Sequence, residues 1–235
     1  MPASRSNPTV LVVTPEVTYL PEGMGNMSNH LTAKAGGLAD VSAALISALF
    51  DQGADVHVTM PDYRALFSDK LAPVLKKEMN RIQRKMPDDR IHLAEDRAFY
   101  YINRVYSYFG DENVKLSLAF QREVINNIVP RVQPDLIHCN DWMTGLIPAA
   151  ARQMGIPCLF TIHNIHTVKS TLAHIEDRGI DAAAFWRHLY FENFSNSYEA
   201  SWEHNPVDFL CSGVFAAHFV NTVSPRFLEE IVGGR

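Results

Sequence analysis

The hexapeptide Thr-Val-Leu-Val-Val-Thr, residues 9–14, decides the fold class of this chain. It is short, β-branched and continuously apolar, which is typical of a strand that is buried on both faces of a parallel sheet. Apolar residues then recur at helical spacing over 38–51, and Gly53 suits the position just past a helix end. Residues 55–60 predict a second strand, stopped by Pro61. Together these segments predict a right-handed βαβ unit.

The same alternation continues along the chain. Further strands are expected over 135–139, 158–163 and 219–224, and further helices over 144–154 and over 114–129, which Pro130 closes. The stretch 90–105 predicts two extended segments, the second of them over 99–102, and 168–205 predicts short helices. The alternation indicates an α/β fold with a Rossmann-like, doubly wound parallel sheet. We expect residues 1–235 to form one such domain, because no repeat or linker interrupts them.

The composition limits the classes of function. The chain has 235 residues, of which 47% are hydrophobic, and a formal net charge of −5. Its mild acidity gives no electrostatic reason to expect nucleic acid as a partner. No apolar run approaches the roughly 20 residues of a membrane helix, so no membrane partner is expected. Three widely spaced cysteines without Cys-x-x-Cys fit a reducing cytosol, so we expect a cytoplasmic protein.

Polar residues follow several of the predicted strands. The first strand and a long loop over 15–35 lead into Lys34-Ala35-Gly36-Gly37-Leu38-Ala39-Asp40, and later strands lead into Asn140-Asp141-Trp142 and His163-Asn164. In an open parallel sheet, ligands bind beyond the carboxyl ends of the strands. We therefore expect these groups to share one rim of the sheet.

The glycine pair has two interpretations. Gly36 and Gly37 let the backbone pass close to a ligand, and they open a helix whose unpaired N–H groups and dipole favour an anion. With the positive charge of Lys34, they suit a phosphate or a diphosphate leaving group. An ordinary loop-to-helix turn beside a solvated lysine fits the same residues equally well. The pair is neither a P-loop nor Gly-x-Gly-x-x-Gly, which argues against a nicotinamide-dependent dehydrogenase.

The other rim residues also have structural and chemical interpretations. Asp141 suits sugar hydroxyls or a developing positive charge, and equally a helix N-cap. Trp142 suits stacking on a ligand, although core packing is commoner for tryptophan. His163 can donate a hydrogen bond to a substrate oxygen, although a lone histidine is more often structural. No metal site is expected, because no usual zinc spacing is formed by His138, Cys139, His163 and His166.

Four motifs occur together, in order, over nearly the whole chain. They are Lys34-x-Gly36-Gly37-Leu38-Ala39-Asp40-Val41, His138-x-x-Asp141-Trp142, Thr161-x-His163-Asn164-Ile165 and Thr222-Val223-Ser224-Pro225. Their order and spacing resemble the N-terminal half of the bacterial glycogen synthases and plant starch synthases. The resemblance implies the GT-B architecture, in which a sugar nucleotide lies between two Rossmann-like domains. It also implies glucose transfer from ADP-glucose to the non-reducing end of an α-1,4-glucan, with retention and without a metal or other cofactor.

The resemblance also implies roles for individual residues. Lys34, Gly36 and Gly37 would face the donor diphosphate, with Asp40 at the edge of the glycine motif. Asp141 and His163 would approach the transferred glucose as the catalytic residues. Trp142 and Asn164 would also line the substrate site.

Three features of this sequence depart from the family's usual pattern. They concern the part of the site that would bind the glucan more than the part that would bind the donor. Asn140 replaces the second histidine of the usual His-x-His-Asp-Trp, residues 166–169 differ from the usual Ala-Tyr-Gln-Gly, and the loop over 17–33 is long. The family's C-terminal domain is expected after Arg235, so the 235 residues alone are expected to be inactive. Two alternatives remain: a non-catalytic module that binds a glucan or a sugar phosphate, and a GT-B transferase for another sugar nucleotide.

Overall fold

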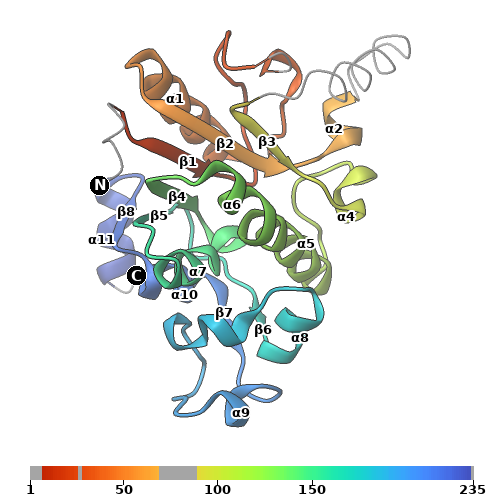
Figure 1. Ribbon diagram of the computed structural model, residues 1–235, viewed down its shortest axis with the longest axis vertical. Coiled ribbons are helices and arrows are strands. Elements are labelled where there is room, and N and C mark those ends of the chain that lie inside the picture. Colours follow the sequence, from red (N-terminus) through yellow and green to blue (C-terminus); the bar gives the residue numbers. More distant parts are fainter. Residues whose placement is uncertain (1–6, 26–27, 69–88, 234–235) are drawn as a thin grey trace.

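The centre of the fold is a six-stranded sheet in which every strand is parallel to its neighbours (Figure 1). The computed structural model describes residues 7–25, 28–68 and 89–233. In the order of the sheet, the strands are β3 (Ile91–Ala94), β2 (Asp55–Pro61), β1 (Thr9–Val13), β4 (Leu136–Asn140), β5 (Cys158–Ile162) and β8 (Phe219–Thr222). This arrangement confirms the predicted parallel α/β fold.

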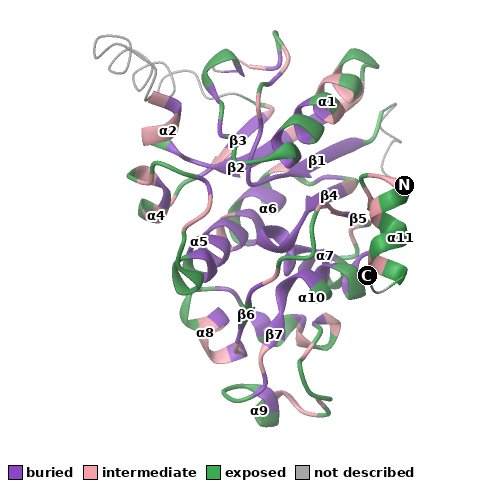
Figure 2. Ribbon diagram, turned by 180° about the vertical axis from the view of Figure 1, so that it is seen from behind, coloured by how far each residue is buried: buried purple, intermediate pink, exposed green. Residues whose placement is uncertain are grey.

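The burial of β1 explains its composition. All five of its residues are buried, because β1 pairs with β2 on one side and β4 on the other. Val12 lies opposite Val58 and His138 and is fully buried. Figure 2 shows the same burial along β1 and much of β4. A strand with neighbours on both edges and helices on both faces has no exposed position for a polar residue.

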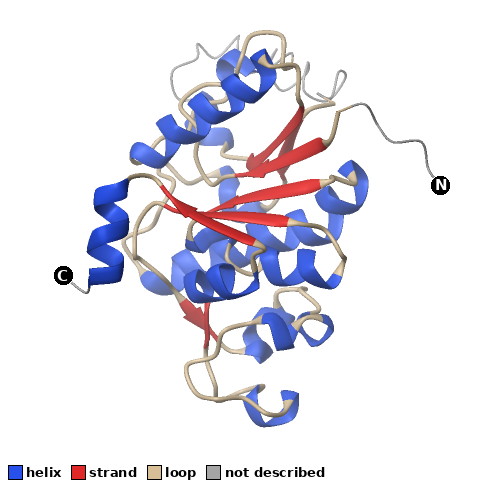
Figure 3. Cartoon of the chain, turned by 90° about the vertical axis from the view of Figure 1, so that its left-hand side faces the viewer, coloured by secondary structure: helices blue, strands red, loops and turns tan. Residues whose placement is uncertain are grey.

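Helices cover both faces of the sheet (Figure 3). α1 (Gly37–Asp51) connects β1 to β2, and α7 (Ile147–Gln153) connects β4 to β5. These two crossovers move in opposite directions along the sheet, so right-handed connections place their helices on opposite faces. The direction changes between β1 and β4, which makes the carboxyl ends of these two strands the expected place for a ligand.

The segment after β3 differs from the prediction. The strand at Ile91–Ala94 is confirmed, but 99–102 is not extended, because Arg97–Tyr100 forms the short helix α4. Asp96 caps this helix, since its Oδ1 accepts a hydrogen bond from the backbone N–H of Ala98 at 2.7 Å. The aspartate at the N-cap therefore outweighs the aromatic β-propensity of the residues that follow.

The long helical segment passes through Pro130 instead of ending there. α5 (Gly110–Glu123) continues through a π-helical turn (Val124–Ile128) into α6 (Val129–Val132). A proline inside an α-helix clashes with the carbonyl group four residues earlier. Pro130 instead lies in the first turn of α6, directly after the π turn, where the missing N–H of a proline is tolerated.

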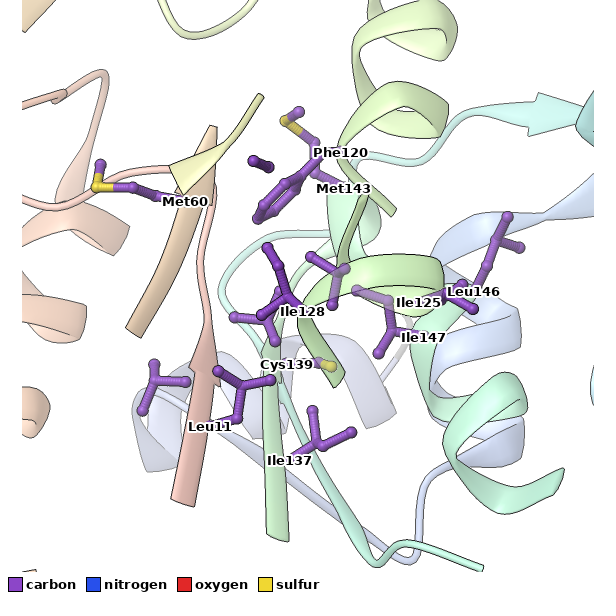
Figure 4. Close-up of a cluster of buried hydrophobic side chains, with 14 of the residues drawn as sticks. Leu11, Met60, Phe120, Ile125, Ile128, Ile137, Cys139, Met143, Leu146 and Ile147 are labelled. Atoms are coloured by element: carbon purple, nitrogen blue, oxygen red, sulfur yellow. The ribbon is translucent and has the colours of Figure 1, made fainter. Parts of the chain in front are cut away.

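A buried cluster fixes this helical segment to the sheet (Figure 4). Leu11, Met60 and Ile137 come from three adjacent strands and are each 0% exposed. They pack with Phe120 of α5 and Ile128 of the π turn, which are at most 2% exposed. Burying each such side chain contributes about 1.5–3 kcal/mol. The strand ends at the rim are therefore held by a rigid core.

A second, smaller sheet lies below the main sheet in Figure 1, near α8 (Leu172–Asp177) and α9 (Tyr198–Ser201). This two-stranded antiparallel sheet is formed by β6 (Lys169–Ser170) and β7 (Val207–Asp208). The remaining described helices are α2 (Arg64–Ser68), α10 (Phe209–Ala216) and α11 (Pro225–Gly233), with 3₁₀ turns at Ser28–His30, Trp142–Thr144, Ala182–Ala184 and Trp186–His188. This confirms the short helices predicted over 168–205. Over the described ranges, no helix is long and apolar enough to cross a membrane.

Candidate active site

The carboxyl ends of β1, β4 and β5 bring two buried acids and an imidazole to one rim. Asp141 follows β4 directly, His163 follows β5 directly, and Glu16 lies three residues beyond β1. Asp141 is 1% exposed and Glu16 is 2% exposed. Two carboxyl groups are costly to bury unless polar partners surround them, so the contacts of each define the site.

Asp141 fixes the turn that follows β5. Its Oδ1 accepts hydrogen bonds from the backbone N–H groups of His163 (2.6 Å) and Asn164 (3.4 Å), and its Oδ2 accepts from Asn164 Nδ2 (2.9 Å). Burial raises the pKa of Asp141 to about 7, although the two backbone hydrogen bonds lower it. Because the side chain reaches β5, it makes no cap bond to the following 3₁₀ turn, and the N-cap interpretation is wrong.

The backbone at Asp141 is strained. Its φ of 57° and ψ of −175° lie in a region that favours glycine. Such a conformation costs of order 1–3 kcal/mol and persists only where surrounding contacts impose it. The three hydrogen bonds of the Asp141 carboxylate are those contacts, and they show that this carboxylate position is specified by the fold.

The imidazole of His163 is oriented by Asn140. Asn140 Nδ2 donates to the carbonyl oxygen of Val13 at 3.2 Å, which directs Asn140 Oδ1 to within 3.0 Å of His163 Nε2. The proton of the neutral ring therefore sits on Nε2, and burial lowers the pKa of His163 to about 4. Nδ1 is then an acceptor, so a substrate hydroxyl would donate to it. This geometry differs from the expectation that His163 donates to a substrate oxygen.

Glu16 is the site residue that the sequence analysis missed. Its Oε2 accepts hydrogen bonds from the backbone N–H groups of Ala35 (2.5 Å) and Gly36 (3.0 Å), and its Oε1 accepts from the hydroxyl of Tyr106 (3.2 Å). Its negative charge also raises the pKa of Asp141. Glu16 thus joins the glycine pair to Asp141, and we call the two buried carboxyl groups of Glu16 and Asp141 the acidic wall. Its position just beyond a strand end was the available signal.

The glycine pair borders open space. A Cβ atom at Gly36 or Gly37 would meet no heavy atom of the described residues within 4 Å. Gly36 has an extended backbone (φ −152°, ψ −159°) and Gly37 begins α1, so neither conformation requires glycine. No side chain in the described part of the chain caps α1. The backbone of the glycine pair is therefore exposed and accessible to a ligand.

Lys34 and Asp40 form an ion pair on the exposed side of the glycine pair. Lys34 Nζ lies 2.8 Å and 2.7 Å from the two carboxylate oxygens of Asp40. This bond, and a second from the Thr18 hydroxyl, lower the pKa of Asp40. Both side chains of the pair are about half exposed, at 46% and 53%. An exposed pair is weak, so Lys34 can exchange Asp40 for an anionic ligand at little cost.

Trp142 and Asn164 are both held by contacts within the protein. Trp142 is 3% exposed, and its ring lies 5.9 Å from that of Tyr106 and 5.3 Å from that of His166. The structure therefore favours core packing over ligand stacking for Trp142. Asn164 Oδ1 accepts from the backbone N–H of His166 at 2.8 Å, which fixes the amide that donates to Asp141.

His138 lies inside the sheet. Its Nε2 is 2.7 Å from Thr161 Oγ1, and that hydroxyl donates to Asn221 Oδ1 at 2.6 Å, so His138 Nε2 is the donor. The three residues tie β4, β5 and β8 together. Burial lowers the pKa of His138 to about 4. Among the described residues, no three His, Cys, Asp or Glu side chains are arranged to hold a metal ion.

We expect the protein to lose stability as the pH falls from 7 to 5. Between pH 6.5 and 4 the unfolded chain binds a proton at His138 that the folded chain does not bind. This difference contributes up to about 2 kcal/mol of loss by pH 5. His163 adds to the loss, whereas the raised pKa of Asp141 opposes it. Urea unfolding at pH 7 and pH 5 measures this. His138→Gln should show a smaller loss, and His204→Gln, at an exposed side chain, should match the wild type.

The fold and the candidate site together define a Rossmann-like α/β protein with a cluster of buried polar groups at the switch point of its sheet. The family model of the starch synthase catalytic domain matches residues 9–235. The chain therefore belongs to the starch synthase catalytic domain family. This confirms the family resemblance of the four sequence motifs.

Individual relatives agree with this family. The chain is similar to glycogen synthases of Moorella thermoacetica (28% identity, 94% of this chain, 45% of the relative) and Opitutus terrae (30% identity, 84% of this chain, 45% of the relative). It thus spans about half the length of the curated relatives it matches. A solved structure of the catalytic domain of starch synthase IV from Arabidopsis thaliana, bound to ADP and acarbose, has the same fold (TM-score 0.65, 18% identity, 96% of this chain, 47% of that chain).

Proposed function

We propose that this chain forms the N-terminal half of a retaining glucosyltransferase, which positions donor and acceptor as glucose moves from ADP-glucose to the non-reducing end of an α-1,4-glucan. The family membership supports this, as do the glycogen synthase relatives and the ADP and acarbose in the starch synthase IV structure. The observation that carries the proposal is the open space over Gly36 and Gly37, next to the carboxylates of Glu16 and Asp141.

The start of α1 would bind the donor diphosphate. Glu16 already occupies the N–H group of Gly36, so the amides left for an anion are those of Gly37 and Leu38. The helix dipole favours negative charge at this end. Lys34 would leave Asp40 and pair with the diphosphate. These groups are aimed at the oxygen atoms on which negative charge grows as the leaving group departs.

The acidic wall would face the glucose. As the diphosphate leaves, the sugar becomes oxocarbenium-like and gains positive charge, which the buried carboxylates of Glu16 and Asp141 stabilise electrostatically. Asp141 also holds the turn at residues 163–164, so it positions His163. His163 Nδ1 would accept a hydrogen bond from a glucose hydroxyl. Fixing the sugar in this way contributes to catalysis through orientation.

Saturation-transfer NMR on ADP-glucose tests this proposal. The residues named above face the diphosphate and the glucose, so the glucose protons should receive more saturation from the chain than the adenine protons. Gly37→Ala should reduce the effect on all ligand protons. Saturation confined to the adenine, or none at ligand concentrations of several millimolar, would contradict the proposal.

We expect no glucose transfer from ADP-glucose to glycogen by the 235-residue polypeptide alone. The relatives are about twice as long, and positioning both substrates accounts for a large part of the rate in such reactions. A radiolabelled glucose assay measures this. Turnover above the level of the Asp141→Ala variant would show that the 235 residues suffice.

A further inference from the structure

The side chain of Asn140 is held in one orientation at the end of β4. Asn140 is 2% exposed, and its strand pairs with β1 on one side and β5 on the other. Its Nδ2 donates to the carbonyl oxygen of Val13, the last residue of β1, at 3.2 Å. A carbonyl oxygen only accepts hydrogen bonds, so the amide cannot be turned over, and Oδ1 is directed toward the residue that follows β5.

That residue is His163, and Asn140 determines which of its ring nitrogens is free. Asn140 Oδ1 lies 3.0 Å from His163 Nε2, and an amide oxygen cannot donate, so Nε2 carries the proton. Burial lowers the pKa of His163 to about 4, so the ring holds only this one proton at pH 7. Nδ1 keeps its lone pair. It forms no hydrogen bond within the described residues, and they do not enclose it.

The residue type at position 140 matters for this arrangement. The usual residue at this place in the family's His-x-His-Asp-Trp motif is a histidine, whereas this chain has asparagine. A second imidazole can donate or accept at either nitrogen and can take up a further proton. It would therefore allow the proton of His163 to sit on either nitrogen. Asparagine does not titrate, and its oxygen accepts only, so His163 is restricted to one form.

The free lone pair of His163 lies next to further negative charge. Asp141 accepts the backbone N–H of His163 at 2.6 Å, and the charge of Glu16 acts on Asp141 strongly enough to raise its pKa. A sugar hydroxyl can donate to Nδ1. A carboxylate on the sugar has no proton to donate, and it would be repelled by both the lone pair and the acidic wall.

We propose that Asn140 is a positioning residue that keeps His163 a neutral hydrogen-bond acceptor, so that the site selects a neutral hexose over a sugar acid. The inference rests on the proposed function, which places the sugar of the donor against His163. A hexose would satisfy Nδ1 through a hydroxyl group. A hexuronic acid would leave both Nδ1 and its own carboxylate unpaired, and unpaired polar groups discriminate between substrates more strongly than size does.

The ring nitrogens of His163 test the first part of this inference. Two-bond proton–nitrogen correlations of the nitrogen-15-labelled chain at pH 7 distinguish a ring nitrogen that carries a proton from one that has a lone pair. The wild type should carry the proton on Nε2. Asn140→Asp should raise the pKa of His163 by about 1–3 pH units, because a carboxylate beside Nε2 favours the charged ring.

Asn221→Asp is the matched control. Asn221 Oδ1 accepts from the Thr161 hydroxyl, whose oxygen accepts from His138 Nε2, so the new charge acts on His138. This variant should raise the pKa of His138 and leave that of His163 unchanged. A proton on Nδ1 of His163 in the wild type would overturn the inference without any variant. An equal pKa of His163 in the wild type and in folded Asn140→Asp would also overturn it.

Binding of two sugar phosphates tests the selection itself. Glucose 1-phosphate and glucuronic acid 1-phosphate differ only in the carboxylate, and NMR titration at pH 5 compares their affinities. The wild type should bind glucose 1-phosphate about tenfold more tightly or better. Asn140→Asp should reduce this preference several-fold, because the charged ring of His163 would donate from Nδ1 to the carboxylate. Equal affinities in the wild type, or an unchanged preference in Asn140→Asp, would overturn the inference.

These results are distinguishable from a failure of the proposed function. Equal binding of the two sugar phosphates, with shifts at the start of α1, contradicts the selection by Asn140 and leaves the donor site in place. Absence of binding by both sugar phosphates contradicts the proposed function, and the selection with it. The proton position on His163 is measured on the free chain, so it decides the role of Asn140 in either case.

Discussion

Gly37→Ala is expected to weaken ADP binding about 5- to 150-fold while leaving the fold at least as stable as that of the wild type. Apart from its own chain neighbours, the new methyl group meets no heavy atom of the described residues within 4 Å, so we expect it to cost little in the free chain. Alanine is also the better helix residue, by up to about 1 kcal/mol. In the complex, the methyl group would occupy space taken by the diphosphate. Overpacking of this kind costs about 1–3 kcal/mol, which corresponds to the stated range of affinity.

Gly110→Ala is the matched control for this prediction. Gly110 also begins a helix, α5, and its added Cβ would likewise meet no heavy atom of the described residues within 4 Å. NMR titration with ADP and urea unfolding should show equal stability gains in the two variants but a loss of affinity only in Gly37→Ala. Equal ADP affinity in both variants would mean that the open space over Gly37 is not the diphosphate site.

Asp141→Ala is expected to lower the free energy of unfolding by about 2–4 kcal/mol. It removes the acceptor for the N–H groups of His163 and Asn164 and for Asn164 Nδ2, and an unpaired buried donor costs about 1–3 kcal/mol. The variant also keeps the strained backbone, with its φ of 57°. Urea unfolding at pH 8, above the raised pKa of about 7, measures the loss.

Asp141→Gly separates the strain from the hydrogen bonds. Glycine removes the same carboxylate but adopts the backbone conformation of residue 141 freely, which should recover about 1–3 kcal/mol relative to Asp141→Ala. Both variants should lose donor binding, because the turn at residues 163–164 is no longer held. A glycine variant less stable than the alanine variant would show that the backbone at residue 141 is not strained.

The fold was predictable where burial alone sets the pattern. β1 has a neighbouring strand on both edges, and all of its residues are buried. Its β-branched, apolar sequence reflects this burial, and for that reason the sequence predicted both the strand and the parallel sheet. The prediction failed where a local contact overrides the pattern. Asp96 caps α4 and makes a helix of an aromatic stretch, and Pro130 is accommodated in the first turn of α6, after the π turn at Val124–Ile128.

The site was predictable in position but not in its contacts. Parallel topology places the residues after β4 and β5 together, so Asp141 and His163 lie on the expected rim. Which atoms meet depends on partners distant in sequence, such as Val13, which orients Asn140 and thereby sets the proton on His163. Glu16 was missed for the same reason, since its role comes from amides in the glycine motif 19 and 20 residues away.

Amide NMR of the chain during titration with ADP tests the central claim most directly. That claim is that the start of α1, the acidic wall of Glu16 and Asp141, and His163 form one donor site. The account predicts that the largest shifts fall on the amides of Gly37 and Leu38, with smaller shifts at His163 and Asn164, whose N–H groups bond Asp141. Shifts that leave the Gly37 and Leu38 amides unmoved and fall on another part of the chain would contradict it.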